Sequence, residues 1–104
     1  MKKETPLVSI CLTFFSAERF IHRVIESVLN QTYQNIEIVI VDNASIDRSR
    51  EVIEKYQTED SRIKYFRNEK KLELTTCFFK MFELAQGDFV VMTGADDWLA
   101  KHAV

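Results

Sequence analysis

Two kinds of hydrophobic pattern alternate along this chain, and the alternation constrains the fold more than any other feature. Nearly continuous apolar runs, rich in β-branched and aromatic residues, are typical of strands covered on both faces. Between them, apolar residues recur at intervals of three and four, as on the buried side of a helix. The runs predict strands over 8–14, 36–42, 63–66 and 89–93, and the intervals predict helices over 17–30, 47–57 and 75–86.

Strand alternating with helix predicts an α/β fold with an open, mainly parallel sheet flanked by helices. Crossovers between parallel strands are right-handed, which leaves few topologies. We expect the spatial order 3-2-1-4, with the first strand inside the sheet. The 104 residues include only two glycines and one proline, so we expect short connections and a single domain over 1–104. Ser16 is expected to cap the first helix, and Gly87 to end the third.

Charge and composition argue against several classes of function. The net charge of −2 disfavours a general nucleic-acid binder, because phosphate neutralisation needs a basic surface. No apolar run approaches a membrane span, and the first residues lead into a strand rather than a signal-peptide core. Cys11 and Cys77 have neither CxxC spacing nor a metal-ligand pattern, so we expect reduced thiols in a cytoplasmic protein. Neither a GxGxxG stretch nor a P-loop is present, which disfavours a dinucleotide cradle.

Polar residues gather where the predicted strands end. In open parallel sheets, ligands bind at the carboxyl ends of the strands, near the point where strand order reverses. The residues expected there are Thr13, Asp42, Asn43, Arg67, Asn68, Asp96 and Asp97. Taken singly, these signals are weak, because Asp42 could form a turn and Asp96 with Asp97 could cap a short helix. The alternative for the last pair is a site for Mg²⁺ or Mn²⁺, which prefer carboxylate oxygens.

A series of short motifs runs along the chain in a recognisable order. They are ESVLNQTY at 26–33, IEIVIVDNASID at 36–47, RIKYFRNE at 62–69, ELAQGDF at 83–89 and ADDW at 95–98. This series resembles family 2 glycosyltransferases with the GT-A fold, and the resemblance extends from Pro6 to Leu99. It implies an enzyme that transfers a sugar, with inversion, from a nucleoside-diphosphate sugar to an acceptor hydroxyl. It also implies a role in bacterial polysaccharide or cell-surface glycan synthesis.

The resemblance assigns roles to the ends of the first two strands. Thr13 and Phe14 would line the base pocket with backbone groups, and Asp42 and Asn43 would lie against the base and the ribose. Asn43 stands where many family members carry an Asp that hydrogen-bonds a uracil N–H. An amide oxygen can still accept that hydrogen bond, but the charge is absent.

The resemblance assigns the end of the fourth strand to the donor diphosphate. Ala95 and Asp96 would line the donor site, and Asp96, helped by Asp97, would bind Mn²⁺ or Mg²⁺. The metal would neutralise charge that develops on the departing diphosphate. Gly94 replaces the first acid of the family's DxD motif, so the stretch here is Gly-Ala-Asp-Asp.

Family members usually run well past 200 residues, and their general base follows the DxD strand. We therefore expect residues 1–104 to be the donor-binding N-terminal part of such an enzyme, inactive in transfer by itself. The acceptor would be a glycan or a lipid-linked sugar, and the full-length enzyme would associate peripherally with the inner face of the membrane. Aromatic residues at 78, 79 and 82 would lack cover, which predicts self-association of this chain.

Two other interpretations stay open at this point. A GT-A-like domain could bind a nucleotide sugar, or another protein, without catalysing transfer. A receiver-type signalling domain also places acids at the ends of parallel strands. That class needs acids after the first strand and after the third, where this chain has Phe15-Ser16 and Arg67-Asn68.

Overall fold

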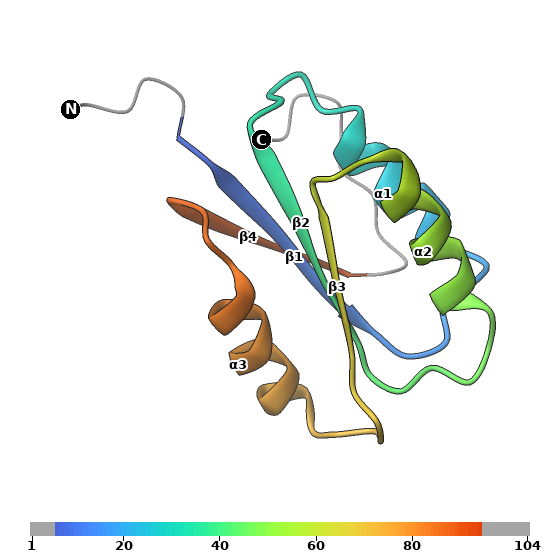
Figure 1. Ribbon diagram of the computed structural model, residues 1–104. Coiled ribbons are helices and arrows are strands. Elements are labelled where there is room, and N and C mark those ends of the chain that lie inside the picture. Colours follow the sequence, from blue (N-terminus) through green and yellow to red (C-terminus); the bar gives the residue numbers. More distant parts are fainter. Residues whose placement is uncertain (1–5, 95–104) are drawn as a thin grey trace.

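The first strand of the chain lies inside a fully parallel sheet, as predicted. The computed structural model describes residues 6–94 (Figure 1). Within that range the elements are β1 (Val8–Phe14), α1 (Ile21–Leu29), β2 (Ile36–Asp42), α2 (Ser49–Glu59), β3 (Ile63–Arg67), α3 (Leu74–Leu84) and β4 (Phe89–Gly94). The strand order is β3-β2-β1-β4, and each neighbouring pair is parallel. The predicted fold class and strand order are confirmed.

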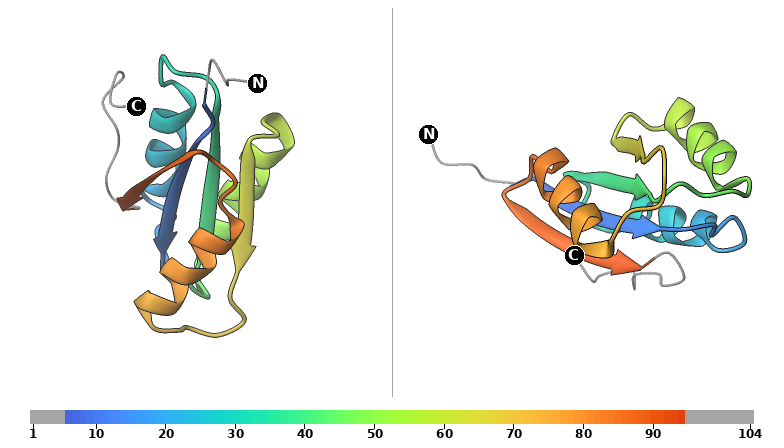
Figure 2. Two further views of the ribbon diagram at one scale, coloured as in Figure 1. Left: turned by 90° about the vertical axis from the view of Figure 1, so that its left-hand side faces the viewer. Right: turned by 90° about the horizontal axis from the view of Figure 1, so that it is seen from below.

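Helices cover the sheet from both sides. Figure 2 shows α1 and α2 on one face and α3 on the other. Successive residues of a strand point to opposite faces, so β1 and β2 supply apolar side chains to both layers. All seven residues of β2 are buried, which explains why its sequence is almost continuously apolar.

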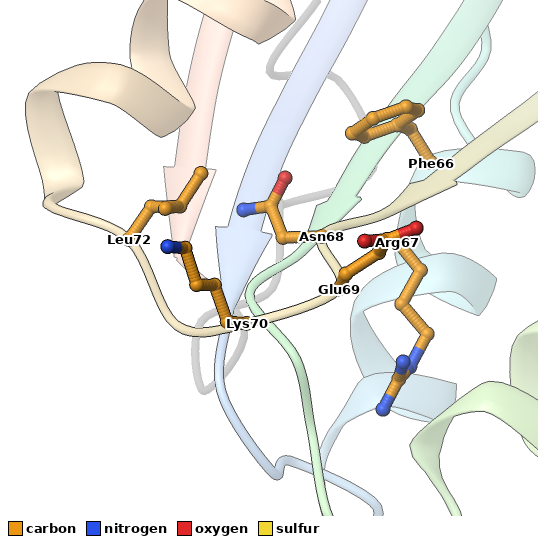
Figure 3. A pocket seen from close by; sticks show the side chains of 6 residues that line it. All are labelled: Phe66, Arg67, Asn68, Glu69, Lys70 and Leu72. Carbon is orange, nitrogen blue, oxygen red and sulfur yellow. The ribbon is translucent and has the colours of Figure 1, made fainter.

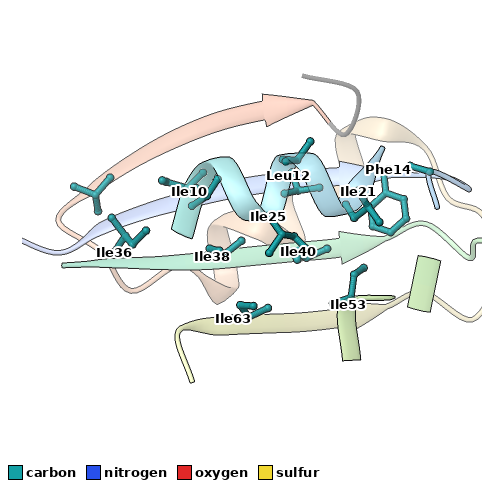
Figure 4. Close-up of a cluster of buried hydrophobic side chains, with 14 residues drawn as sticks. Ile10, Leu12, Phe14, Ile21, Ile25, Ile36, Ile38, Ile40, Ile53 and Ile63 are labelled. Atoms are coloured by element: carbon teal, nitrogen blue, oxygen red, sulfur yellow. The ribbon is translucent and has the colours of Figure 1, made fainter. Parts of the chain in front are cut away.

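The larger core lies between the sheet and helices α1 and α2 (Figure 4). Its side chains are aliphatic except for one phenylalanine. They are Val8, Ile10, Leu12, Phe14, Ala17, Ile21, Val24, Ile25, Val28, Ile36, Ile38, Ile40, Ile53 and Ile63. Four of the residues that helix α1 contributes recur at the three- and four-residue spacing that predicted this helix.

The core under α3 is smaller and is bordered by polar groups. It contains Cys11, Val39, Val41, Cys77 and Met81. Both cysteines are buried and free, as expected. Further out on this side, large apolar side chains reach solvent: Phe79 is 71% exposed, Phe82 53% and Met92 41%. The prediction that aromatic residues of this helix lie uncovered is therefore confirmed for Phe79 and Phe82, and it is wrong for Phe78, which packs against the smaller core.

A buried carboxylate joins β1, β2, β3 and the segment before β4 near the amino ends of the strands. Glu37 on β2 accepts hydrogen bonds from Ser9 Oγ at 2.5 Å and from the Gln86 N–H at 2.6 Å. Its other oxygen pairs with Lys64 Nζ of β3 at 2.6 Å. Burial acts to raise the pKa of Glu37, but the bonds from Lys64, Ser9 and Gln86 outweigh it, and the pKa lies below its ordinary value.

Two expectations about helix ends are wrong. Helix α1 begins at Ile21 rather than at 17, and Ser16 does not cap it. Ser16 instead has a positive φ of 51° and accepts a hydrogen bond from the Ile46 N–H through Oγ. Helix α3 ends at Leu84, so Gly87 is not its stop signal.

Gly87 has a different reason to be a glycine. A Cβ atom at this position would lie 2.5 Å from Ser9 Oγ, 2.7 Å from Ser9 N and 2.8 Å from the Leu7 oxygen. Two of these three atoms belong to the backbone, so they cannot turn aside as a flexible side chain could. Any side chain at this position would therefore force one of the two chain segments to shift.

Candidate functional site

The carboxyl ends of β1, β2 and β3 meet at one edge of the sheet, and the predicted site residues of these strands lie there. The register pairs Thr13 with Val41 and with Gly94, and it pairs Asp42 with Phe14 and with Arg67. Thr13 is half-buried and donates its hydroxyl to the Val41 oxygen at 2.9 Å. The side chain of Phe14 packs in the larger core, which leaves only its backbone for a ligand. The backbone role that the resemblance implies for Thr13 and Phe14 stays a prediction.

Asp42 is completely buried and holds the loop that follows its own strand. Its Oδ1 accepts from the Ser45 N–H at 2.8 Å, and its Oδ2 accepts from the Tyr65 hydroxyl at 2.6 Å. Arg67 donates to the Ser45 oxygen at 2.8 Å, while its Nε lies 3.9 Å from Asp42 Oδ2. Burial and the bond to Asp42 raise the pKa of Tyr65. Within this loop Ala44 adopts a positive φ of 63°, a conformation that needs such support.

Asn43 is 7% exposed, and it hydrogen-bonds the connection between β3 and α3. Its Oδ1 accepts from the Leu72 N–H at 2.8 Å and from Asn68 Nδ2 at 3.0 Å. Its Nδ2 donates to the Leu72 oxygen at 2.9 Å. Both lone pairs of the amide oxygen are therefore used within the chain.

The loops after β1 and β2 are joined by reciprocal hydrogen bonds. The Ser45 hydroxyl accepts from the Ser16 N–H at 2.7 Å, and the Ser16 hydroxyl accepts from the Ile46 N–H at 3.1 Å. Ser49 Oγ accepts from the Ala17 N–H at 2.9 Å. These bonds give the rim of the site a fixed shape before any ligand arrives.

Asp47 adds a charge to this rim. Its Oδ1 accepts from the backbone and hydroxyl of Ser49 at 3.0 and 2.6 Å, and its Oδ2 accepts from the Glu18 N–H at 3.1 Å. Burial acts to raise the pKa of Asp47, but these bonds outweigh it and the pKa lies below its ordinary value. The carboxylate is therefore ionised at neutral pH.

The end of β3 and the loop after it line a hollow with a volume of about 660 Å³ (Figure 3). Its lining residues are Phe66, Arg67, Asn68, Glu69, Lys70 and Leu72. The lining thus combines two cations and one acid with two apolar side chains. Beside it, Lys71 Nζ lies 4.1 Å from the centre of the Phe15 ring, so the loops after β1 and β3 touch at their tips.

Three predicted site residues, Ala95, Asp96 and Asp97, lie outside the described residues. Within 6–94 no group of three or more His, Cys, Asp or Glu side chains could hold a metal ion. The structure does bring the end of β4 beside the end of β1, through the pairing of Gly94 with Thr13. In the same range no helix is long and apolar enough to cross a membrane.

Tyr65 and Ser45 support the site without having been predicted from the sequence. Tyr65 lies two residues after Ile63 on β3, so strand alternation places it on the same face as Asp42. From this alternation the face of the sheet on which Tyr65 lies could have been predicted. Contact with Asp42 depends also on the register of β2 against β3, and a shift of that register by two residues would leave the alternating pattern unchanged.

The chain matches the family model described as Glycosyl transferase family 2 over residues 9–104. It is 38% identical to a putative glycosyltransferase, EpsH of Bacillus subtilis, over 92% of this chain and 28% of that protein. The structure of S. aureus TarS 1–349 in complex with UDP superposes with a TM-score of 0.82 at 23% identity, covering 91% of this chain and 29% of that one. The mannosyltransferase PcManGT of Pyrobaculum calidifontis, in complex with GDP-Man and Mn²⁺, gives 0.83 at 20% identity over 89% and 28%. The chain thus spans less than a third of each of these proteins.

Proposed function

This chain belongs to glycosyl transferase family 2, and we propose that it carries the donor-binding part of an inverting glycosyltransferase. The observation that supports the proposal most is the family match, which extends over residues 9–104. The donor is a nucleoside-diphosphate sugar, and two structures of the same fold were determined with UDP and with GDP-Man. The acceptor is a hydroxyl of a glycan or of a lipid-linked sugar in bacterial polysaccharide or cell-surface glycan synthesis.

In this proposal the nucleoside lies at the ends of β1 and β2. Thr13 and Phe14 offer backbone groups, and the reciprocal bonds between the loops after β1 and β2 hold that edge in shape. Asp42 acts there through the loop at 43–45, since its carboxylate has no exposed surface. Binding to a rim that is already ordered costs less conformational entropy than ordering it on binding.

The diphosphate lies toward the end of β4. Asp96, helped by Asp97, binds Mn²⁺ or Mg²⁺ there, and Ala95 lines the donor site with them. Carboxylate oxygens suit these ions, which take their remaining ligands from phosphate oxygens and water. Support for this arrangement comes from the register, which brings Gly94 beside Thr13 at the nucleoside edge, and from PcManGT, whose structure holds GDP-Man and Mn²⁺.

Further steps of the reaction require residues beyond this chain. The general base that deprotonates the acceptor belongs to the acceptor-binding part, so residues 1–104 bind the donor and do not transfer the sugar. The whole enzyme works in the cytoplasm and associates peripherally with the inner face of the membrane. The apolar surface of Phe79, Phe82 and Met92 drives self-association of this chain, which sedimentation over a concentration series measures.

Calorimetry of UDP and GDP binding tests the proposal. Wild type, Asp96→Ala and the control Asp60→Ala are each titrated with Mn²⁺ and with chelator. Asp60 pairs with Arg62 just before β3, at the opposite edge of the sheet, so its removal should leave binding unchanged. We expect Mn²⁺ to strengthen binding roughly tenfold or more in wild type and in Asp60→Ala, and not in Asp96→Ala.

Two results would contradict the proposal in different ways. If Asp96→Ala keeps the full gain from Mn²⁺, the metal assignment is wrong. If no nucleoside diphosphate binds under any condition, the donor-binding role is wrong, and the alternative of a non-catalytic interaction module is favoured.

A further inference from the structure

The side chain of Asn43 and the backbone of Leu72 form a closed pair of hydrogen bonds. The amide oxygen accepts from the Leu72 N–H at 2.8 Å, and the amide nitrogen donates to the Leu72 oxygen at 2.9 Å. Such two-way pairing is what two adjacent strands exchange, here made by a side chain. It connects the end of β2 to a loop residue 29 positions later in the sequence.

A second asparagine fixes the orientation of the first. Asn68 is 6% exposed, and its Nδ2 donates to Asn43 Oδ1 at 3.0 Å. If the Asn43 amide were turned over, its NH₂ group would face two donors and its oxygen would face the Leu72 oxygen. Hydrogen bonding therefore permits one orientation of this buried amide.

The same loop forms the wall of the hollow after β3. Asn68 and Leu72, the two partners of Asn43, both line it, as do Glu69 and Lys70 between them. Figure 3 shows these four side chains along the loop that runs from β3 towards α3. The position of this wall therefore depends on the Asn43 amide.

We propose that Asn43 is a positioning residue that holds the loop at 68–72 as the wall of the donor site. In this proposal its amide oxygen does not accept a hydrogen bond from the nucleobase. The role of the loop in donor binding rests on the proposed function; the clamp formed by Asn43, Asn68 and Leu72 does not. An aspartate at this position is not equivalent. A carboxylate can accept from Asn68 and from the Leu72 N–H, but it cannot donate to the Leu72 oxygen, which would face a buried negative oxygen.

Hydrogen exchange of the Leu72 amide reports the clamp directly, because its N–H is bonded to Asn43 Oδ1. The variants are Asn43→Asp, Asn68→Ala and the control Asn30→Asp, which makes the same chemical change at an exposed residue after α1. At pH 7.5 we expect exchange at Leu72 to accelerate roughly tenfold or more in Asn43→Asp, since the Leu72 oxygen loses its donor and faces a buried negative oxygen, which should open the pair. Asn68→Ala, which leaves the Leu72 pair intact, should give a smaller acceleration, and the control none.

Lowering the pH separates this role from a general loss of stability. Burial raises the pKa of the introduced carboxyl, and its protonated form has both a donor and an acceptor, like the amide. The ratio of Leu72 exchange in Asn43→Asp to that in wild type, each measured at the same pH, should therefore fall towards one between pH 7.5 and pH 5.5. If Asn43→Asp is unfolded at pH 7.5, the test rests on Asn68→Ala. Faster Leu72 exchange in Asn68→Ala than in wild type then supports the inference, and unchanged exchange contradicts it.

Binding of UDP completes the test. We expect Asn43→Asp to weaken UDP binding at pH 7.5 and Asn30→Asp to leave it unchanged. The inference is wrong if Leu72 exchange is the same in Asn43→Asp and wild type. It is also wrong if Asn43→Asp binds UDP more tightly, which is the result expected of a side chain that accepts a hydrogen bond from the nucleobase. If no protein binds UDP while the exchange results are as expected, the proposed function fails and the clamp stands.

Discussion

The two faces of the sheet are built on opposite principles. On the face of α1 and α2, aliphatic side chains pack against one another, and central residues such as Ile38 have no exposed surface. On the face of α3, the core is small, a buried carboxylate bonds to three elements, and Phe79 and Met92 remain exposed. The first face resists change through packing, whereas the second depends on a few specific bonds. Substitutions should therefore act by different mechanisms on the two sides.

The largest effect should come from a truncation in the packed face. Ile38→Ala removes a fully buried side chain from the middle of β2, so we expect a loss of about 2–5 kcal/mol in the free energy of unfolding. Met92→Ala on the other face should cost less than about 1 kcal/mol, because Met92 is already 41% exposed. Denaturant titration of both variants measures the contrast. Equal losses would show that the α3 face is packed as fully as the other.

A smaller loss is expected where two backbone segments touch. Gly87→Ala would place a Cβ within 2.8 Å of the backbone at Ser9 and Leu7, so the start of β4 must shift. We expect a cost of about 1–3 kcal/mol, as for other overpacked positions. The neighbouring exposed Gln86 serves as a control, since Gln86→Ala should change stability by about 0.5 kcal/mol or less. If Gly87→Ala leaves the free energy of unfolding unchanged, the two backbone segments can move apart at little cost.

Lowering the pH should destabilise the α3 face by protonating Glu37. Because the folded state lowers the pKa of Glu37, its contribution to stability is complete above the ordinary value of 4.5 and is lost as pH falls through the folded pKa. Above pH 5 wild type should thus be more stable than Glu37→Gln, by about 1–3 kcal/mol for hydrogen bonds to a charged group. The difference should shrink below pH 4.5. The control is Glu83→Gln, which makes the same chemical change at an exposed residue and should change stability by about 0.5 kcal/mol or less at neutral pH. Thermal unfolding at a series of pH values measures both.

The smallest effect is a change in reactivity without a change in stability. Burial and the nearby Glu37 raise the pKa of Cys11 to about 11. At pH 8 its reaction with a thiol reagent should be roughly a hundredfold slower than that of an ordinary thiol, through loss of thiolate alone. The rate should rise with pH well beyond pH 9. Rapid labelling of Cys11 in the native protein at pH 8 would show that the α3 face opens often.

Periodicity was sufficient to predict the sheet, because buried strands and one-sided helices leave distinct patterns in the sequence. It did not predict the start of α1, since Ser16 forms a bond to another loop in place of a cap. The strand-end positions of Asp42 and Asn43 were also predictable, but their roles depend on partners 23 to 29 residues away. Which side chain meets which depends on the exact register and on the loop path, and an alternating pattern is unchanged when a strand is shifted by two residues.

The pairing of β1 with β4 has a consequence for synthesis of the chain on the ribosome. Leu7, just before β1, bonds to Asp88, just before β4, and these residues are 81 positions apart. At usual rates of translation, roughly 4 to 16 seconds separate their appearance. During that interval β1 can pair with β2, but its other edge has no partner, and that edge is where a nascent chain would meet a chaperone or a neighbouring chain.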